Sequence, residues 1–86
     1  MSYVWSDEAW QDYVEWQQQD AKMLAKINEL VKDIRRNPYR GLGKPEPLKH
    51  GLKGYWSRRI SQEHRLVYKV ESSDVYIVSC RYHYEK

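Results

Sequence analysis

Residues 64–80 read HRLVYKVESSDVYIVSC, and two stretches of alternating side chains in this segment flank a short polar turn. Successive side chains of a strand point to opposite faces of a sheet, so this period of two predicts strands over residues 64–70 and 75–84. A further alternating stretch, YWSRRIS, occupies residues 55–61. Because the connections are short, the three strands are expected to be antiparallel neighbours. The C-terminal part of the chain therefore predicts a small antiparallel sheet.

The N-terminal part of the chain has helical periodicity instead. Ser6, which two acidic residues follow, predicts a helix N-cap, and Asp20 predicts the N-cap of a second helix. The second helix is expected to end at Asn37-Pro38, because proline cannot continue a helix. The apolar start Tyr3–Trp5 predicts a short strand. Together these patterns predict an α+β fold in which two N-terminal helices pack on one face of a small antiparallel sheet.

Residues 37–54 connect the two parts and contain all three prolines and all four glycines of the chain. This composition is typical of a structured loop rather than of a linker between domains, and a short strand is expected near Leu48. With a length of 86 residues, the chain is expected to form a single domain over residues 1–86.

The composition disfavours several classes of protein. The chain has no apolar run long enough to span a membrane, and its first residues lack the basic and apolar regions of a signal peptide. Cys80 is the only cysteine, so an internal disulfide is impossible and a cytoplasmic setting with a buried thiol is expected. No His/Cys or Asp/Glu cluster has the spacing of metal ligands, so we expect neither a metal nor another cofactor.

Basic residues are concentrated in the middle of the chain. Residues 1–20 contain five acidic side chains and no lysine or arginine, a charge of −5, so the remainder must carry +8 to give the total of +3. Residues 35–65 contain nine basic side chains and two acidic ones. Such a segment suits a polyanionic partner, but charge alone fits a solvated surface equally well.

Strand alternation predicts where the side chains of the sheet point. Leu66 and Tyr68 share one face of their strand, and Arg65 lies on the other. In the last strand, one set of alternate side chains is expected to face the helices: Tyr76, Val78, Cys80 and Tyr82. The side chains expected together on the uncovered face are Arg59, Arg65, Arg81 and His83.

A face with three arginines and a histidine suits the chemistry of RNA phosphates. Arginine binds phosphate oxygens in pairs and keeps its charge, whereas His83 can exchange a proton near neutral pH. Glu46 lies between two prolines in KPEPLKH and is a candidate base. RNA contains its own nucleophile, the 2′-hydroxyl, so its cleavage needs a base, an acid and cations around the phosphate, but no metal.

Each of these residues also has a structural interpretation. His64 opens a strand beside Arg65, where a structural hydrogen bond is expected rather than catalysis. His83, taken alone, favours a structural histidine over an acid. The tyrosines fit core positions, although exposed ones could stack on unpaired bases. The residues by themselves indicate an RNA-binding or RNA-cutting domain.

The segment KPEPLKHGLKGYWSRRISQEHRLVYKV and the later SCRYHY resemble the YoeB toxins of bacterial toxin–antitoxin systems, within the RelE superfamily. The resemblance extends from Tyr3 to Tyr84. It implies a microbial-ribonuclease-like α+β domain that enters the ribosomal A site and cuts mRNA without a metal, which halts translation. It also implies a YefM-type antitoxin that wraps the toxin, a homodimer, and operator DNA bound only through the antitoxin complex.

The resemblance also assigns roles to residues of this chain. It implies that Glu46 is the general base, that Arg65 stabilises the phosphate and that His83 is the general acid. Tyr84 matches a terminal tyrosine that helps to order the site. Basic side chains are further candidates for binding RNA or phosphate: Lys49 and Arg59, which match flanking family positions, and Arg81, which strand alternation adds.

Three functions are open at this point. The first is a ribosome-dependent endoribonuclease that leaves a 2′,3′-cyclic phosphate and a 5′-hydroxyl. The second is a non-catalytic RNA- or ribosome-binding module, which would bind in a salt-sensitive way and create no new RNA ends. The third is an interaction protein whose basic face holds an acidic partner segment. The combination of Glu46, Arg65 and His83 favours the first, because binding alone needs no paired acid and base.

Overall fold

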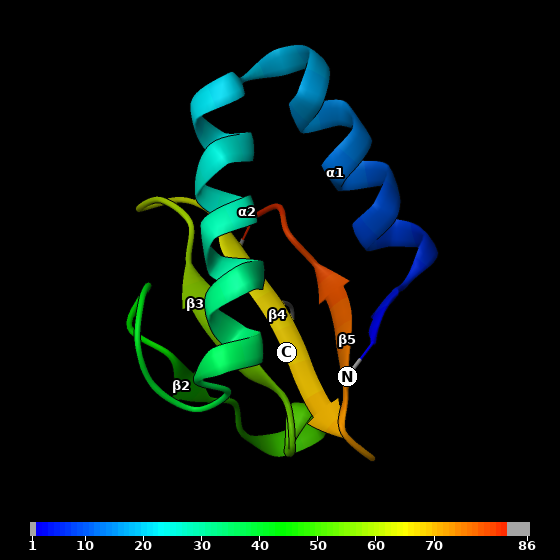
Figure 1. Ribbon diagram of the computed structural model, residues 1–86, viewed down its shortest axis with the longest axis vertical. Helices are drawn as coiled ribbons and strands as arrows, with labels where there is room; N and C mark the ends of the chain where they lie inside the picture. The colour runs from blue at the N-terminus through cyan, green and yellow to red at the C-terminus, as the bar shows by residue number, and fades with distance from the viewer. Residues whose placement is uncertain (1, 83–86) are drawn as a thin grey trace.

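The structure is a computed structural model that describes residues 2–82 (Figure 1). Two helices lie against one face of a five-stranded sheet. The elements in chain order are β1 (Tyr3–Trp5), α1 (Asp7–Gln19), α2 (Ala21–Arg36), β2 (Glu46–Pro47), the 3₁₀ helix η1 (His50–Leu52), β3 (Trp56–Arg59), β4 (Arg65–Glu71) and β5 (Asp74–Ser79). Within residues 2–82, neither helix is long and apolar enough to cross a membrane.

The strands are ordered β1-β5-β4-β3-β2 across the sheet. The pairs from β2 to β5 are antiparallel, as expected, and β1 adds one parallel pair at the edge beside β5. A parallel partner requires a long crossover, and the whole of the chain between β1 and β5 provides it. The predicted α+β class is therefore confirmed, with a sheet that is mostly antiparallel.

The predicted helix signals are confirmed by their contacts. The Ser6 hydroxyl accepts a hydrogen bond from the Ala9 amide at 3.0 Å, and the Asp20 carboxylate accepts from the amides of Lys22 and Met23. Such bonds satisfy amide groups that have no partner inside the helix. α2 ends at Arg36, immediately before the predicted stop. The caps thus set where both helices begin.

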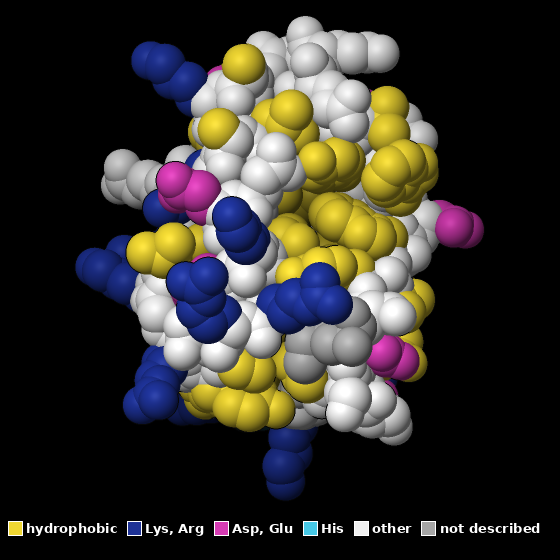
Figure 2. All heavy atoms as spheres, viewed as in Figure 1, with side chains coloured by type: hydrophobic (Ala, Val, Ile, Leu, Met, Phe, Trp, Pro, Cys, Tyr) yellow, Lys and Arg dark blue, Asp and Glu magenta, His cyan; other side chains and the backbone are white. Residues whose placement is uncertain are grey.

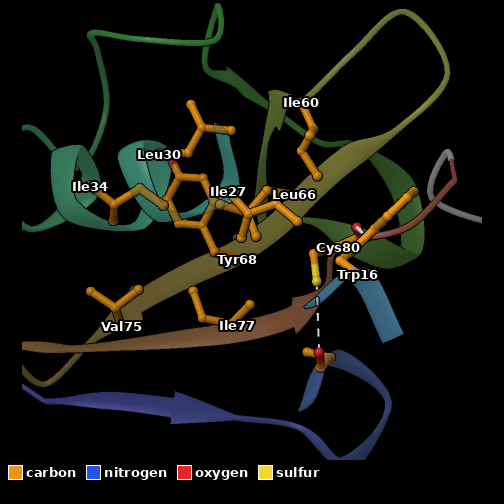
Figure 3. Packing of buried hydrophobic residues seen from close by; sticks show 11 residues of the cluster. Trp16, Ile27, Leu30, Ile34, Ile60, Leu66, Tyr68, Val75, Ile77 and Cys80 are labelled. Carbon is orange, nitrogen blue, oxygen red and sulfur yellow. Dashed lines mark hydrogen bonds between the residues drawn. The ribbon is translucent and has the colours of Figure 1, made fainter. Parts of the chain in front are cut away.

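The core lies between the two helices and the sheet. Its members come from α1, α2, β4, β5 and the loops at the strand ends, and Figure 3 labels most of them: Trp16, Ile27, Leu30, Ile34, Ile60, Leu66, Tyr68, Val75, Ile77 and Cys80. The predicted burial of Cys80 is confirmed. Burial raises the pKa of its thiol to about 12, so the thiol stays protonated at neutral pH.

The face predicted for the last strand was wrong at Tyr76 and Val78. Val75 and Ile77 point into the core, whereas Tyr76 and Val78 are half-buried on the other side. All four side chains are apolar, so the alternation alone did not distinguish the two faces. Cys80 is nevertheless in the core, which means that the alternation is reversed between positions 77 and 80.

An irregularity in the pairing of β4 with β5 explains this reversal. The neighbours Val67 and Tyr68 pair with Ser79 and Ile77, so Val78 is an extra residue on β5. An extra residue of this kind, a β-bulge, bends the strand and redirects the side chains that follow. The bulge therefore explains why the alternation misplaces Tyr76 and Val78 and yet places Cys80 correctly.

A buried arginine ties the loop before β2 to the sheet. Arg58 of β3 is fully buried on the helix side, and it forms an ion pair of 2.6 Å with Asp33 of α2. Its guanidinium also donates to the Tyr68 hydroxyl and to backbone carbonyls of the loop, those of Asn37, Arg40 and Leu42. The hydrogen bond from Arg58 holds the pKa of Asp33 below its ordinary value. These bonds fix the loop from which β2 and Glu46 emerge.

Candidate active site on the open face of the sheet

Three of the predicted site residues share the face of the sheet that the helices do not cover. Glu46 of β2 pairs with Ser57 of β3, two residues before Arg59, and Arg59 pairs with Arg65 of β4. Directly opposed residues of an antiparallel pair point to the same face. Leu66 of β4 points into the core, so its neighbour Arg65 and the others point away from the helices. We call this the open face.

Glu46 lies on the outermost strand of the sheet and is exposed. Prolines on both sides restrict its backbone, and an edge strand is where proline is tolerated in a sheet. The pairing with β3 continues past the strand, because the Leu48 amide donates to the Tyr55 carbonyl at 2.9 Å. The carboxylate is thus carried on a backbone that β3 holds along one side and that the flanking prolines restrict, which suits a group that must meet a substrate in one position.

Arg59 and Arg65 place two guanidinium groups on neighbouring strands. Arg59 is exposed, and Arg65 is half-buried with Nη1 donating to the carbonyls of Ser61, Gln62 and His64. These bonds orient the Arg65 side chain against the turn between β3 and β4. Arginine keeps its charge at any physiological pH, so the open face offers two permanent cations and a carboxylate.

Arg81 does not join this face, contrary to the sequence-based expectation. Its Nη2 donates to Gln19 at 2.7 Å, its Nη1 lies 3.6 Å from the Glu15 carboxylate, and its guanidinium stacks 4.2 Å from the Trp16 ring. All three partners belong to α1. The bulge in β5 and the end of the strand at Ser79 remove the alternation on which the expectation rested.

The remaining predicted residues divide into two groups. Lys49 is exposed and lies at the N-cap of η1, three residues after Glu46. His83 and Tyr84 lie outside the described residues. Tyr82, the last described residue, is 59% exposed rather than part of the core, and its carbonyl accepts a hydrogen bond of 3.0 Å from the Arg65 amide. The chain is therefore held beside Arg65 at the residue that precedes His83.

His64 has the structural hydrogen bond that the sequence predicted. It is buried, and its Nδ1 accepts from the Tyr82 amide at 2.8 Å. Two further contacts were not predicted: the Asp12 carboxylate accepts from the Cys80 amide, and the Trp16 indole donates to the Cys80 carbonyl. Burial raises the pKa of Asp12, which the Cys80 amide partly opposes. The one available signal was an acidic residue on the apolar side of the first helix, between Ala9 and Trp16.

A second feature lies on the helix side, between β1, α1 and α2. It is a hollow of about 600 Å³ with an aromatic floor and a cationic rim, which Figure 2 shows as a yellow patch beside dark blue side chains. The floor contains Tyr3, Trp5 and Tyr13, and the rim contains Lys32, Arg35 and Arg36. Such a groove suits a peptide that carries both apolar and acidic side chains.

Within residues 2–82, no three His, Cys, Asp or Glu side chains gather where they could hold a metal ion. The functional side chains that the structure describes on the open face are those of Glu46, Arg59 and Arg65. An exposed carboxylate beside two guanidinium groups can take a proton and stabilise a phosphate.

Comparison with known proteins identifies the family. The sequence profile of the family described as "YoeB-like toxin of bacterial type II toxin-antitoxin system" matches residues 5–84. This chain belongs to the YoeB-like toxin family. The YoeB toxin of Escherichia coli K12 is 58% identical to it over 84 residues, which cover 98% of this chain and all of the relative.

Solved structures of this family have the same fold. The YoeB dimer from Staphylococcus aureus superposes with a TM-score of 0.91 at 53% identity, and 98% of each chain is covered. The heterotetrameric YoeB–YefM toxin–antitoxin complex from Staphylococcus aureus gives a TM-score of 0.89 at 54% identity, with 95% of each chain covered. The present YoeB-like chain is thus a toxin of the type II toxin–antitoxin class.

Proposed function

We propose that this toxin is a ribosome-dependent endoribonuclease that cuts mRNA in the A site and so halts translation. The observation that carries the proposal is the placement of Glu46, Arg59 and Arg65 on the open face, in a chain of the YoeB-like family. This set supplies a base and two cations, and the chain reaches His83 from beside Arg65. Because its proposed target is the ribosome, we expect the toxin to act in the cytoplasm.

The proposed reaction is an internal transesterification of RNA. Glu46 takes the proton of a 2′-hydroxyl, and the 2′-oxygen forms a bond to the adjacent phosphorus. Arg65, with Arg59 and Lys49 nearby, stabilises the extra negative charge of the five-coordinate phosphate. His83 gives a proton to the departing 5′-oxygen as the bond from phosphorus to that oxygen breaks, and Tyr84 helps to order the site. The products are a 2′,3′-cyclic phosphate and a 5′-hydroxyl, and the scheme requires no metal or cofactor.

The experiment is a cell-free translation reaction in which new mRNA 5′ ends are mapped by primer extension. Wild type is compared with His83→Ala, Glu46→Ala and the control Glu29→Ala, which removes an exposed glutamate of α2 on the helix side. New ends that require ribosomes should appear with wild type and the control. In the two site variants, the rate at which new ends form should be about 10²–10⁴-fold lower, because this is the usual contribution of a general acid or base.

Two other outcomes would contradict the proposal. Translation arrest by wild type without new RNA ends would indicate a binding module that blocks the ribosome without catalysis. Cleavage at the wild-type rate by Glu46→Ala and His83→Ala would mean that the assigned roles are wrong, even if the toxin is a nuclease. The addition of EDTA to purified, cross-linked ribosome complexes would further test the metal independence of the cleavage step.

We also infer that this toxin is held by an antitoxin of the YefM type and that it forms a homodimer. The support is the complex and the dimer solved for the Staphylococcus aureus relatives. The groove on the helix side is the surface we assign to the antitoxin, because its cationic rim and aromatic floor complement an acidic, apolar segment. Operator DNA is expected to bind only through the toxin–antitoxin complex.

Charge reversal on the rim of this groove tests the assignment. Lys32→Glu should weaken binding of the cognate antitoxin by about 10-fold or more in calorimetry, because like charges would face each other. Lys22→Glu, at the start of the same helix, serves as the control and should bind as wild type does. Equal affinities of the two variants would place the antitoxin elsewhere, and light scattering of the free toxin gives its oligomeric state.

A further inference from the structure

The three residues that precede His83 are held by a set of hydrogen bonds that we call the tail clamp. β5 ends at Ser79, so residues 80–82 are not part of the regular sheet. Cys80 is fixed at both of its backbone groups: its amide donates to Asp12 at 3.2 Å, and its carbonyl accepts from the Trp16 indole at 2.9 Å. Figure 3 shows Trp16 beside Cys80 at the edge of the core.

Tyr82 is fixed at both of its backbone groups as well. Its amide donates to Nδ1 of His64 at 2.8 Å, and its carbonyl accepts from the Arg65 amide at 3.0 Å. Tyr82 has a φ of 59°, in the left-handed region that side chains other than glycine rarely adopt. Such a conformation persists only where the surroundings hold it. The bond that the Tyr82 amide donates to His64 is one of the two that do so.

The environment of His64 separates its packing role from its hydrogen-bonding role. The ring is 6% exposed and packs edge-on to Trp16, with centroids 4.9 Å apart, and at 5.3 Å from the Tyr82 ring. A phenylalanine would make these ring contacts equally well. What histidine adds is an acceptor at Nδ1, which places the ring proton on Nε2, 3.7 Å from the Glu63 carboxylate.

We propose that His64 is a positioning residue for the cleavage reaction: its Nδ1 fixes the backbone of Tyr82, the residue that directly precedes His83. The proposal rests on the proposed nuclease function, in which His83 is the general acid. Because His64 adjoins Arg65 in β4, the same strand end orients the phosphate-binding arginine and the chain that carries the acid. His64 itself transfers no proton to or from the RNA.

The test uses two substitutions, one of which keeps the buried ring of His64 while the other keeps the hydrogen-bond acceptor. His64→Phe keeps a buried ring but removes the acceptor. His64→Asn loses the ring, but its Oδ1 is attached at the same branch point as Nδ1 and can accept from the Tyr82 amide. The control is His50→Asn, because His50 is exposed in η1. Cleavage of mRNA on programmed ribosomes gives kcat and KM for each protein, and urea unfolding gives its stability.

We expect the two variants to rank in opposite order for kcat and for stability. His64→Phe should lower kcat by about 10- to 100-fold, the scale of a small misplacement of a catalytic group, while KM and stability change little. His64→Asn should retain most of the kcat, although it is less stable because ring packing is lost. His64→Gln, whose acceptor lies one atom further out, should lower kcat as His64→Phe does, and it replaces that variant if His64→Phe does not fold.

A readout that is independent of catalysis separates this proposal from the proposed function. Amide hydrogen exchange at Tyr82 should be slow in wild type and His64→Asn and at least about 10-fold faster in His64→Phe. If wild type cuts no mRNA, the nuclease proposal fails, and the exchange rates still decide whether the clamp exists. If wild type cuts mRNA and His64→Phe retains full kcat, or if kcat simply follows stability across the variants, His64 is structural only and the positioning proposal is wrong.

Discussion

Arg58 and Arg59 are consecutive residues of β3, yet the protein uses them in opposite ways. Arg58 points toward the helices, is fully buried and gives its donors to Asp33, to Tyr68 and to loop carbonyls. Arg59 points to the open face and is exposed. A guanidinium whose donors are all used inside the protein contributes to the fold, whereas one directed at solvent is available to a ligand. One face of β3 thus stabilises the fold, and the other presents a side chain to a ligand.

The largest expected effect is on the helix side. Arg58→Met should lower the free energy of unfolding by about 3–5 kcal/mol, because it removes the partner of Asp33 and of several partly buried carbonyls. Arg59→Met, the matched change on the open face, should alter stability by no more than about 0.5 kcal/mol. Urea unfolding of both variants measures the difference. Equal losses of stability would mean that the two faces are not divided in this way.

A second prediction concerns the activity that depends on Arg59 of the open face. Arg59→Ala should reduce ribosome-dependent mRNA cleavage by about 10-fold or more, because one cation beside the phosphate is lost, and the protein should remain as stable as wild type. Primer-extension yields at matched toxin concentrations measure the loss. Arg40→Ala, which removes an exposed arginine of the 37–54 loop, provides the control. A loss of the same size in the control would indicate general charge attraction rather than a site.

The ion pair of Arg58 with Asp33 predicts a dependence of stability on pH. The pKa of Asp33 is lower in the folded protein than its ordinary value of 3.8. The pair therefore adds stability at pH values above 3.8, and this contribution is lost as the pH falls through the lowered native pKa. Urea unfolding between pH 7 and pH 3 should give a shallower acid decline for Asp33→Asn than for wild type. Parallel curves would show that Asp33 has the same pKa in both states.

The smallest expected effect is at Arg81. Because its guanidinium stacks on Trp16 and bonds to Gln19, Arg81→Ala should cost about 0.5–1 kcal/mol of stability. It should reduce cleavage less than Arg59→Ala does, which thermal unfolding and primer extension together can establish. A larger loss of cleavage at Arg81 than at Arg59 would restore the phosphate-binding role that strand alternation indicated.

Much of the fold follows from local signals in the sequence. The caps at Ser6 and Asp20, the end of α2 before Asn37 and the strands around Leu66 were predictable, because each depends on residues within a few positions of one another. Glu46 and Arg65 were also predictable as candidates, from their residue types and from the family resemblance. Their common face required only the pairing of neighbouring strands.

The parts that were not predictable depend on contacts across the chain. The bulge at Val78 arises where β4 and β5 meet, and the four apolar residues in that stretch contain no sign of which side faces the core. The hydrogen bond from the Cys80 amide to Asp12 joins residues 68 positions apart. No local pattern encodes such a bond, and it is Asp12 and its neighbours in the tail clamp that hold the chain before His83.

The sequence by itself determined the types of the elements and the α+β class, and it supplied the carboxylate and guanidinium groups of the candidate site. Only the tertiary structure decided which partners surround the buried Arg58, that Arg81 lies against α1, and that His64 holds Tyr82. The physical reason is that the direction of a side chain depends on what it packs against. That partner is supplied by the folded chain, whereas periodicity and capping are supplied by the nearest residues.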